Sequence, residues 1–346
     1  TICKCIKARV LLYAASPLWN GSFYDKSWKN SKYETPGYGN ELVSSQYERK
    51  KWDNALVACQ EALTAAKKAG YNLFDIETAN SIAEKQKVPL PFIPGKEEDT
   101  PENTLFKERV RMFQYLVASN ESDGNNELIW GVNTKRMGPS DYWPTISQAP
   151  RKIIKTNGTT WHSMSGWSFN APTLNTVQRF YTENGKLPAD DNDFYRKSEW
   201  YIRFYEGTSS PALERDDIDK EDVKNDIIKF NVGREARYYA WIAFDGCQYA
   251  TNIRDGEPLW LNLKNSATNG YVLNDRNYTG TGFMTKKFMT PDIKYDKTNK
   301  VTGNTTRLPF IRMAELYLNL AECYAAQGNT PKALENLNKV HQRAGL

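Results

Sequence analysis

Long hydrophobic runs are absent from this 346-residue sequence, whose mean hydropathy is −0.69. No apolar stretch approaches the roughly 18 residues that a membrane-spanning helix needs. Runs of positive charge are absent as well, because the 46 basic and 41 acidic residues are scattered along the chain. No five Lys or Arg residues stand in a row, so the net charge of +5 does not predict a nucleic-acid-binding surface.

Sequence motifs of several common enzyme classes are missing too. The only histidines are His162 and His341, and no serine stands in a G-x-S-x-G motif. Gly280-Thr281-Gly282 lacks the third glycine and the preceding strand of a dinucleotide-binding fingerprint, and no G-K-[ST] motif occurs. Glycosidase carboxylates are recognised by the distance between them, which a sequence does not contain. We therefore expect a protein that is not an enzyme and has no cofactor.

The five cysteines predict neither a disulfide framework nor a zinc site. Cys3 and Cys5 are too close in sequence for the usual C-x₂-C half of a zinc site, and no partner pair exists. Cys59 and Cys323 fall on the inward faces of expected helices, where a small apolar side chain fits. Cys247 has no assigned role.

Two acidic clusters, Asp190–Asp193 and Glu214–Asp222, carry oxygen ligands of the kind that Ca²⁺ prefers. Neither cluster has the D-x-[DN]-x-[DN]-G spacing of a calcium loop. Solvated loops are the simpler interpretation, and a structural Ca²⁺ in one of them stays open.

Aromatic residues make up 13% of a composition that is otherwise typical of a globular protein, with 40% hydrophobic and 25% charged residues. Aromatic rings among polar residues suit a surface that grips a polar ligand by its flat faces. An aromatic-rich core would give the same count. A chain of this length can bury one large core or two smaller ones.

The C-terminal segment 307–346 predicts two amphipathic helices joined by a tight turn, because apolar residues recur at spacings of three and four. Gly328 suits a turn with positive φ, and Pro331 suits the first turn of the second helix. The offsets match a tetratricopeptide (TPR) unit, in which Tyr324 and Leu337 would be buried between the helices. The positions of the pattern are Leu316, Leu320, Ala321, Tyr324, Ala333, Leu337 and Val340.

A second helix pair is expected near the N-terminus, divided by a long insertion. The first helix stops at Ser16-Pro17, and the second begins near Trp52, with Ala55, Cys59 and Ala62 at its packing positions. The insertion carries aromatic residues that either form a second ligand surface or, as the simpler interpretation, tie the insertion down. These residues are Trp19, Tyr24, Trp28 and Tyr33.

Motifs along almost the whole chain, taken in order, resemble the SusD/RagB family. One of them departs from the family pattern, because Glu235-Ala236 stands where the family has Asp-Pro. The segments that carry the resemblance are Arg9–Leu18, Glu127–Trp130, Pro172–Gly185, Arg234–Tyr238, Thr279–Gly282, Lys286–Phe288, Phe310–Glu322 and Asn338–Leu346.

The resemblance implies a mainly α fold, an α-α superhelix in which a TPR-like helical scaffold packs against an irregular, loop-rich, ligand-binding region. We expect a single SusD-like unit over residues 1–346, with the scaffold in 1–120 and 305–346 and the loop-rich insert in 121–304. Helices are expected near 1–16, 48–70, 102–120 and 309–344. Within the insert we expect only two more, near 172–184 and 189–206.

The resemblance also implies a function. Members of the family are cell-surface nutrient-binding lipoproteins of Bacteroidetes-type bacteria, and each works with a SusC-like TonB-dependent transporter in the outer membrane. The resemblance therefore predicts binding of an oligosaccharide or polysaccharide without catalysis. It also predicts that this chain is N-terminally incomplete and that a lipid anchor belongs to the missing part. Peptide capture on the same scaffold, and a TPR interaction scaffold with no small ligand, stay open as alternatives.

A ligand site is expected between residues 130 and 167, where tryptophans stand in polar loops. The ring of a sugar presents an apolar C–H face and a rim of hydroxyls, so aromatic rings beside polar side chains are its natural complement. The predicted aromatic contacts are Trp143, Trp161, Trp167 and Tyr142, and the predicted polar contacts are Asp141, Arg136 and Asn133.

Overall fold

The computed structural model describes most of the chain, with the backbone alone at residues 133, 152–154 and 160–162. The described residues are 1–25, 27–33, 36–133, 148–154, 160–162, 166–168, 170–205, 224–264, 269–271, 278–296, 301–303 and 307–345.

The part of the protein that the structure describes is mainly helical, with 43% helix and 15% strand, as the sequence predicted. Its contacts divide it into two units. Unit 1 comprises Thr1–Leu73, Asn126–Gly131 and Pro309–Leu346, and unit 2 comprises Phe74–Asn125 and Val132–Leu308. The domain boundaries expected from the sequence stay a prediction.

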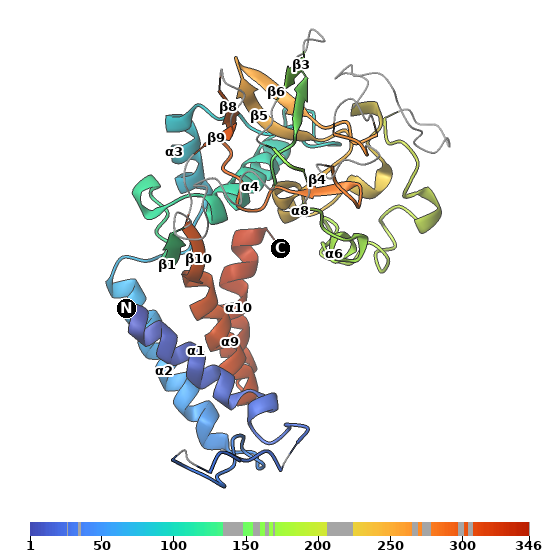
Figure 1. Cartoon of the computed structure of the whole chain (residues 1–346). Helices are drawn as coiled ribbons and strands as arrows, with labels where there is room; N and C mark the ends of the chain where they lie inside the picture. Colours follow the sequence, from blue (N-terminus) through green and yellow to red (C-terminus); the bar gives the residue numbers. More distant parts are fainter. Residues whose placement is uncertain are drawn as a thin grey trace. The chain divides into compact units, whose positions relative to one another are not determined.

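Unit 1 is built from two helical hairpins (Figure 1). Helix α1 packs against α2, α9 packs against α10, and α2 joins the hairpins by packing against α9. These helices confirm the expected segments, except that a short strand and not a helix precedes α9. The elements are α1 Ile2–Ala15, α2 Arg49–Lys68, β10 Arg307–Arg312, α9 Met313–Ala326 and α10 Thr330–Ala344, and β10 pairs with β1 Leu128–Asn133.

The residues between α9 and α10 form the turn and the helix cap that the sequence predicted. Gly328 adopts a φ of 77°, which lets the chain turn sharply after α9. The side chain of Asn329 accepts a hydrogen bond of 3.2 Å from the backbone amide of Lys332, and Pro331 stands in the first turn of α10. These caps explain why one short turn separates two helices.

The core of unit 1 consists largely of small side chains. Ala55, Ala62, Cys59 and Cys323 are fully buried, so the helices approach one another closely. Both cysteines are free thiols, joined by a hydrogen bond. The expected burial of these residues is therefore confirmed.

The expected burial of Tyr324 and Leu337 is met only in part, because both side chains are half-buried; Tyr324 packs against the core of unit 1. The hydroxyl of Tyr324 reaches the surface and accepts a hydrogen bond of 2.9 Å from the side-chain amide of Gln60. Within α10 only Ala333 and Asn336 are buried, so this helix covers less of the core than the spacing suggested.

A buried carboxylate ties the end of the chain to β1 and β10. Glu127, immediately before β1, has a fully buried side chain. One of its oxygens lies 3.0 Å from a guanidinium nitrogen of Arg312, and the other accepts a hydrogen bond from Arg343 on α10. Both positive charges compensate a carboxylate that would otherwise be costly to bury.

Unit 2 contains two longer helices, α3 Ile76–Gln86 and α4 Pro101–Ala118, which pack against each other. The sequence predicted α4 but not α3. Helix α3 begins where the side chain of Asp75 accepts a 2.8 Å hydrogen bond from the backbone amide of Thr78. Its buried residues Ala79, Ile82 and Ala83 form a narrow apolar stripe, which is a weak signal in so short a helix.

Two helices expected in the insert are not formed as predicted. The first is reduced to α6 Leu174–Gln178, and in place of the second, near 189–206, stands one turn, η4 Lys197–Glu199. The side chain of Asp191 explains part of this, because it accepts hydrogen bonds from Thr182 and from the backbone amide of Asp193. Such local bonds compete with a helix.

Arg234 explains where α6 ends and organises the core around it. Its guanidinium donates hydrogen bonds of 2.9–3.0 Å to the carbonyl oxygens of Val177, Phe180 and Phe230. The guanidinium also lies 4.4 Å from the centre of the Tyr238 ring. Arg234 has no exposed surface, and burial lowers its pKa. The bonds to Val177 and Phe180 give donors to carbonyl groups at the end of α6, where helical partners are missing.

The remaining elements of unit 2 include, within the described residues, short antiparallel strand pairs, one short α-helix and the single turns η2 Glu121–Asp123 and η5 Lys229–Asn231. The pairs are β2 with β3, β4 with β7, β5 with β6, and β8 with β9. Their bounds, with that of the helix, are β2 Lys152–Ile154, β3 Thr160–His162, α8 Ala236–Trp241, β4 Ile242–Phe244, β5 Gln248–Arg254, β6 Glu257–Trp260, β7 Phe283–Thr285, β8 Lys294–Tyr295 and β9 Val301–Thr302.

Candidate functional site

Four of the seven predicted site residues lie outside the described part of the chain, and their role in ligand binding stays a prediction. They are Arg136, Asp141, Tyr142 and Trp143. Two more have a described backbone only. Asn133 is the last residue of β1, and Trp161 is the middle residue of β3, where it pairs with Ile153 of β2.

Trp167 is the predicted site residue whose side chain is described, and 47% of its surface is exposed. Its neighbours Gly166 and Ser168 are buried. A Cβ atom at Gly166 would collide with the carbonyl oxygen of Pro150, and Ser168 adopts a φ of 54°. A backbone packed this tightly fixes the point on the chain from which the exposed indole extends.

Hydrogen bonds fasten the Trp167 loop to residues 148–151. The amide of Ser168 donates to the carbonyl oxygen of Ala149 at 3.1 Å, and its hydroxyl accepts from the amide of Arg151 at 2.9 Å. The buried hydroxyls of Tyr249 and Tyr295 donate to the carbonyl oxygens of residues 148 and 150. The loop is thus supported from the core of unit 2.

A cavity of about 250 Å³ lies elsewhere in unit 2 and combines charged and aromatic walls. The ammonium group of Lys264 lies 3.3 Å from Asp226 and 3.2 Å from Asp245. Burial raises the pKa of Asp245. Tyr201 and Phe283 supply the aromatic surface. Paired carboxylates beside rings can accept hydrogen bonds from hydroxyl groups while the rings cover an apolar face.

Strand β7 connects this cavity with the segment that follows Trp167. The amide of Thr285 donates to the carbonyl oxygen of Asn170 at 3.3 Å, and the hydroxyl of Thr281 donates to that of Pro172 at 2.8 Å. Phe283, between these two threonines, lines the cavity. The exposed indole and the cavity therefore belong to neighbouring segments of one unit.

Sequence reasoning did not identify the residues of this cavity. Asp226, Asp245 and Lys264 stand in no common motif and are far apart in the chain. The pairing of β4 with β7, the hydrogen bond of 2.7 Å from the Leu263 amide to Asp245, and the ion pairs of Lys264 bring this region together.

The first acidic cluster, Asp190–Asp193, is engaged by the protein itself. The carboxylate of Asp191 accepts hydrogen bonds from Thr182, Asn184 and the amide of Asp193, and these bonds lower its pKa. No group of three possible metal-ligating side chains occurs among the described residues. The second cluster, Glu214–Asp222, lies outside the described residues, and a Ca²⁺ site there stays a prediction.

A membrane-spanning helix is also not found in the described part of the chain, because no helix there is both long and apolar enough.

Comparison with known proteins places the chain in one family. The model of the SusD family matches residues 126–346. Two solved structures of the protein BT4246, one of them in its selenomethionine form, match 100% of this chain, with identities of 44% and 43% and TM-scores of 0.81 and 0.80. No curated protein matches. The chain spans about half the length of the two solved structures, covering 55% and 53% of them.

Proposed function

Because this chain belongs to the SusD family, we propose that it captures an oligosaccharide without catalysis and delivers it to a transporter in the outer membrane. Proteins of this family are generally non-catalytic binding proteins, and they are cell-surface lipoproteins of the outer membrane. For this chain the ligand, the partner and the location are inferences from the family.

The observation that best supports a glycan ligand is the exposed indole of Trp167 on its fastened loop. A flat ring that is held in place can stack on the apolar face of a sugar with little loss of side-chain entropy. The cavity around Lys264 adds carboxylate acceptors for hydroxyl groups, in neighbouring segments of the same unit. The two features together match the two surfaces of a sugar ring.

Delivery requires a partner. We propose a SusC-like TonB-dependent β-barrel, with the binding protein lipid-anchored at the cell surface and covering the mouth of the barrel reversibly. Mild-detergent extraction of the full-length protein from outer membranes should then recover a large β-barrel with it. Recovery of the intact lipoprotein alone would contradict the pairing.

The ligand is tested by comparing a glycan array with a peptide library and then measuring affinity for the best ligand by calorimetry. Trp167→Ala should weaken glycan binding about tenfold, since aromatic stacking contributes on the order of 1 kcal/mol. Trp130→Ala is the matched control, because Trp130 is also partly exposed but lies in unit 1. Thermal unfolding should show that both variants are folded at the temperature of the binding assay, with Trp130→Ala losing stability because its ring packs edge-on against Phe310.

Other results would redirect the proposal. Binding of peptides but not glycans would favour peptide capture, and failure of both panels would favour an interaction scaffold without a small ligand. Equal affinities of the wild type and Trp167→Ala for the glycan would exclude Trp167 from the site.

A further inference from the structure

The insertion between α1 and α2, residues 16–48, is held at both ends by one buried side chain. The side-chain amide of Asn20 donates hydrogen bonds of 3.2 Å to the carbonyl oxygens of Ala15 and Glu48. Its oxygen accepts from the amide of Glu48 at 2.8 Å. A Cβ atom at Gly21 would lie 2.7 Å from the amide nitrogen of Tyr47, so the two arms of the insertion are in close contact.

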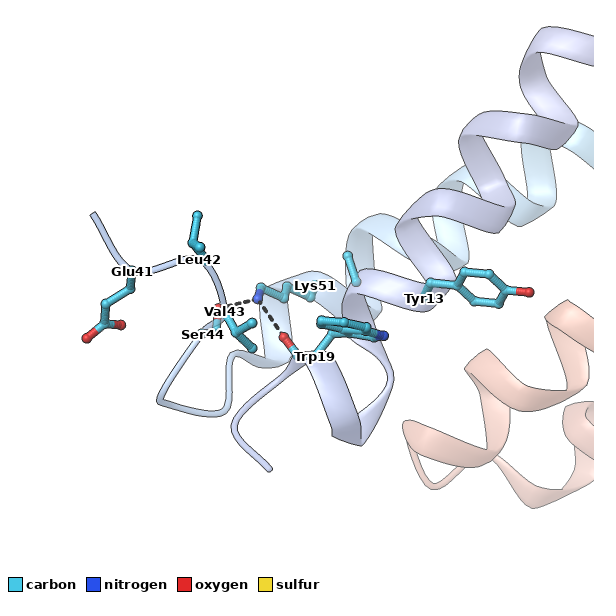
Figure 2. Close-up of a pocket in the computed structure, with 8 residues that line it drawn as sticks. Tyr13, Trp19, Glu41, Leu42, Val43, Ser44 and Lys51 are labelled. Atoms are coloured by element: carbon cyan, nitrogen blue, oxygen red, sulfur yellow. Dashed lines mark hydrogen bonds between the residues drawn. The ribbon is translucent and has the colours of Figure 1, made fainter. Parts of the chain in front are cut away.

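The two ends of the insertion, together with α1 and α2, border a groove of about 640 Å³ (Figure 2). Lys51, in the first turns of α2, extends toward two other segments and donates hydrogen bonds to the hydroxyl of Ser44 and the carbonyl oxygen of Trp19. The groove is thus assembled from α1, the turn after it, residues 41–44 and α2. Its volume lies within the range of about 300–1,000 Å³ that is usual for small-ligand sites.

The walls of the groove are both aromatic and polar. Tyr13 and Trp19 are 61% and 40% exposed, respectively, and Glu41 and Lys51 add charged groups. The ammonium group of Lys51 lies 3.7 Å from the carboxylate of Glu48, which balances its charge. With Lys51 balanced by Glu48 and with Glu41 adding a negative charge, the groove favours a neutral ligand over an anion.

Stacked rings continue the aromatic surface beyond the groove. Trp19 and Phe23 lie 5.6 Å apart at an interplanar angle of 19°, and Phe23 and Trp28 lie 5.3 Å apart at 20°. Tyr24, beside this row, is 88% exposed. Rings stacked in this way turn their inner faces toward one another, so an extended ligand would meet the outer faces and edges of the stack and the exposed Tyr24.

We propose that this groove and the adjoining rings form a second carbohydrate-binding site, for a neutral linear oligosaccharide. The assignment of a sugar rests on the proposed function, while the site itself is separate from the Trp167 loop and lies in unit 1. A protein partner fits less well, because the centres of protein interfaces are depleted in Lys and Glu. Here Lys51 and Glu41 line the groove itself.

The test labels the protein with 5-fluorotryptophan and follows the fluorine NMR signals of Trp19 and Trp167. Trp19→Ala and Trp167→Ala assign the two signals. The probes are cellohexaose, maltohexaose, xylohexaose and mannohexaose, all neutral and linear. At least one should shift the Trp19 signal, also in Trp167→Ala, where the other site is removed.

Affinity measurements complete the test. In the Trp167→Ala background, the further substitution Trp19→Ala should weaken binding about tenfold. Tyr13→Ala, on α1, should weaken it to a similar extent. Trp130→Ala should not. Tyr13 is 61% exposed, so the thermal unfolding of Tyr13→Ala should match that of the wild type. Trp19 is 40% exposed and stacks on Phe23, so Trp19→Ala should unfold at a somewhat lower temperature but stay folded at the temperature of the binding assay.

The outcomes separate the two proposals. A shift of Trp167 without a shift of Trp19 overturns the second site and leaves the proposed function intact. No shift of either signal with any probe overturns this site, and the glycan array then decides the proposed function. The Trp19 signal could also stay unshifted with all four sugars and shift when a purified outer-membrane β-barrel is added. That result would overturn the sugar site and assign the groove to protein docking.

Discussion

The cores of the two units are built from different chemistry. In unit 1, alanines and cysteines recur along helices and let backbones approach closely, as at Ala55 and Cys323. In unit 2, a fully buried arginine, Arg234, is surrounded by aromatic rings such as Tyr238 and Phe230. One core depends mainly on shape, and the other depends on polar groups whose hydrogen bonds must all be made.

This difference predicts different responses to mutation. Removing a methyl or methylene group from a packed helix pair costs free energy in proportion to the cavity that is left. Removing one member of a buried polar network also leaves its partners without hydrogen bonds. Replacing a buried polar side chain in unit 2 should therefore lower the free energy of unfolding more than replacing a half-buried side chain in unit 1.

The largest effect is expected for Arg234→Met. The methionine fills similar space but leaves the carbonyl oxygens of Val177, Phe180 and Phe230 without their donor. We expect a loss of about 3–5 kcal/mol in the free energy of unfolding, measured with urea. Arg307→Met, at an exposed ion pair with Glu121, is the control and should cost less than about 1 kcal/mol. Similar losses for both would remove the contrast.

Glu127→Gln tests whether unit 1 also depends on a buried charge. The amide cannot compensate the charges of Arg312 and Arg343, so we expect a loss of about 2–4 kcal/mol by urea unfolding. Glu121→Gln removes the exposed pair with Arg307 and should change stability by less than about 1 kcal/mol. A negligible effect of Glu127→Gln would show that unit 1 is held by apolar packing alone.

Tyr324→Ala should have a smaller effect. Because the ring is half-buried, we expect a loss of about 1–2 kcal/mol, below the 3–5 kcal/mol of a fully buried aromatic residue. Tyr324→Phe, which removes only the hydroxyl that bonds to Gln60, should cost about 0.5–1 kcal/mol in the same calorimetric melting experiment. A loss for Tyr324→Ala as large as that for Arg234→Met would contradict the proposed difference between the cores.

The smallest effect is a pH dependence at Asp191. Hydrogen bonds from Thr182, Asn184 and the amide of Asp193 lower its pKa below the ordinary value of 3.8. The carboxylate therefore contributes stability that is fully present above about pH 4 and is lost as the pH falls through the folded-state pKa. Asp191→Asn should flatten the fall in the free energy of unfolding below about pH 4. Parallel curves for both proteins would exclude this contribution.

The segments that the sequence predicted well are those whose structure depends on residues close to one another in the sequence. Helices α1, α2, α4, α9 and α10 carry apolar residues at helical spacing, and the turn before α10 carries Gly328, Asn329 and Pro331. Their buried faces follow from the 3.6-residue period of the helix. The expected helix near 189–206 was wrong because Asp191 forms local bonds that no periodicity records.

The candidate site residues also differ in how far the sequence predicted them. Composition and family resemblance drew attention to tryptophans in polar loops, and of these the exposed side chain of Trp167 is described. No pattern indicated that Asp226, Asp245 and Lys264 meet at one cavity. The groove around Trp19 depends on Asn20, a single polar residue whose clamping role is visible only once α1 and α2 are side by side.

The sequence by itself determined the helical hairpins, the burial of Cys59 and Cys323, and the family to which the chain belongs, since each is encoded in contiguous residues or in their order. Only the tertiary structure decided how exposed Tyr324 and Trp167 are and which charged side chains meet. The physical reason is that exposure and ion pairing depend on segments distant in the chain, whose approach is set by packing and by long-range hydrogen bonds rather than by local periodicity.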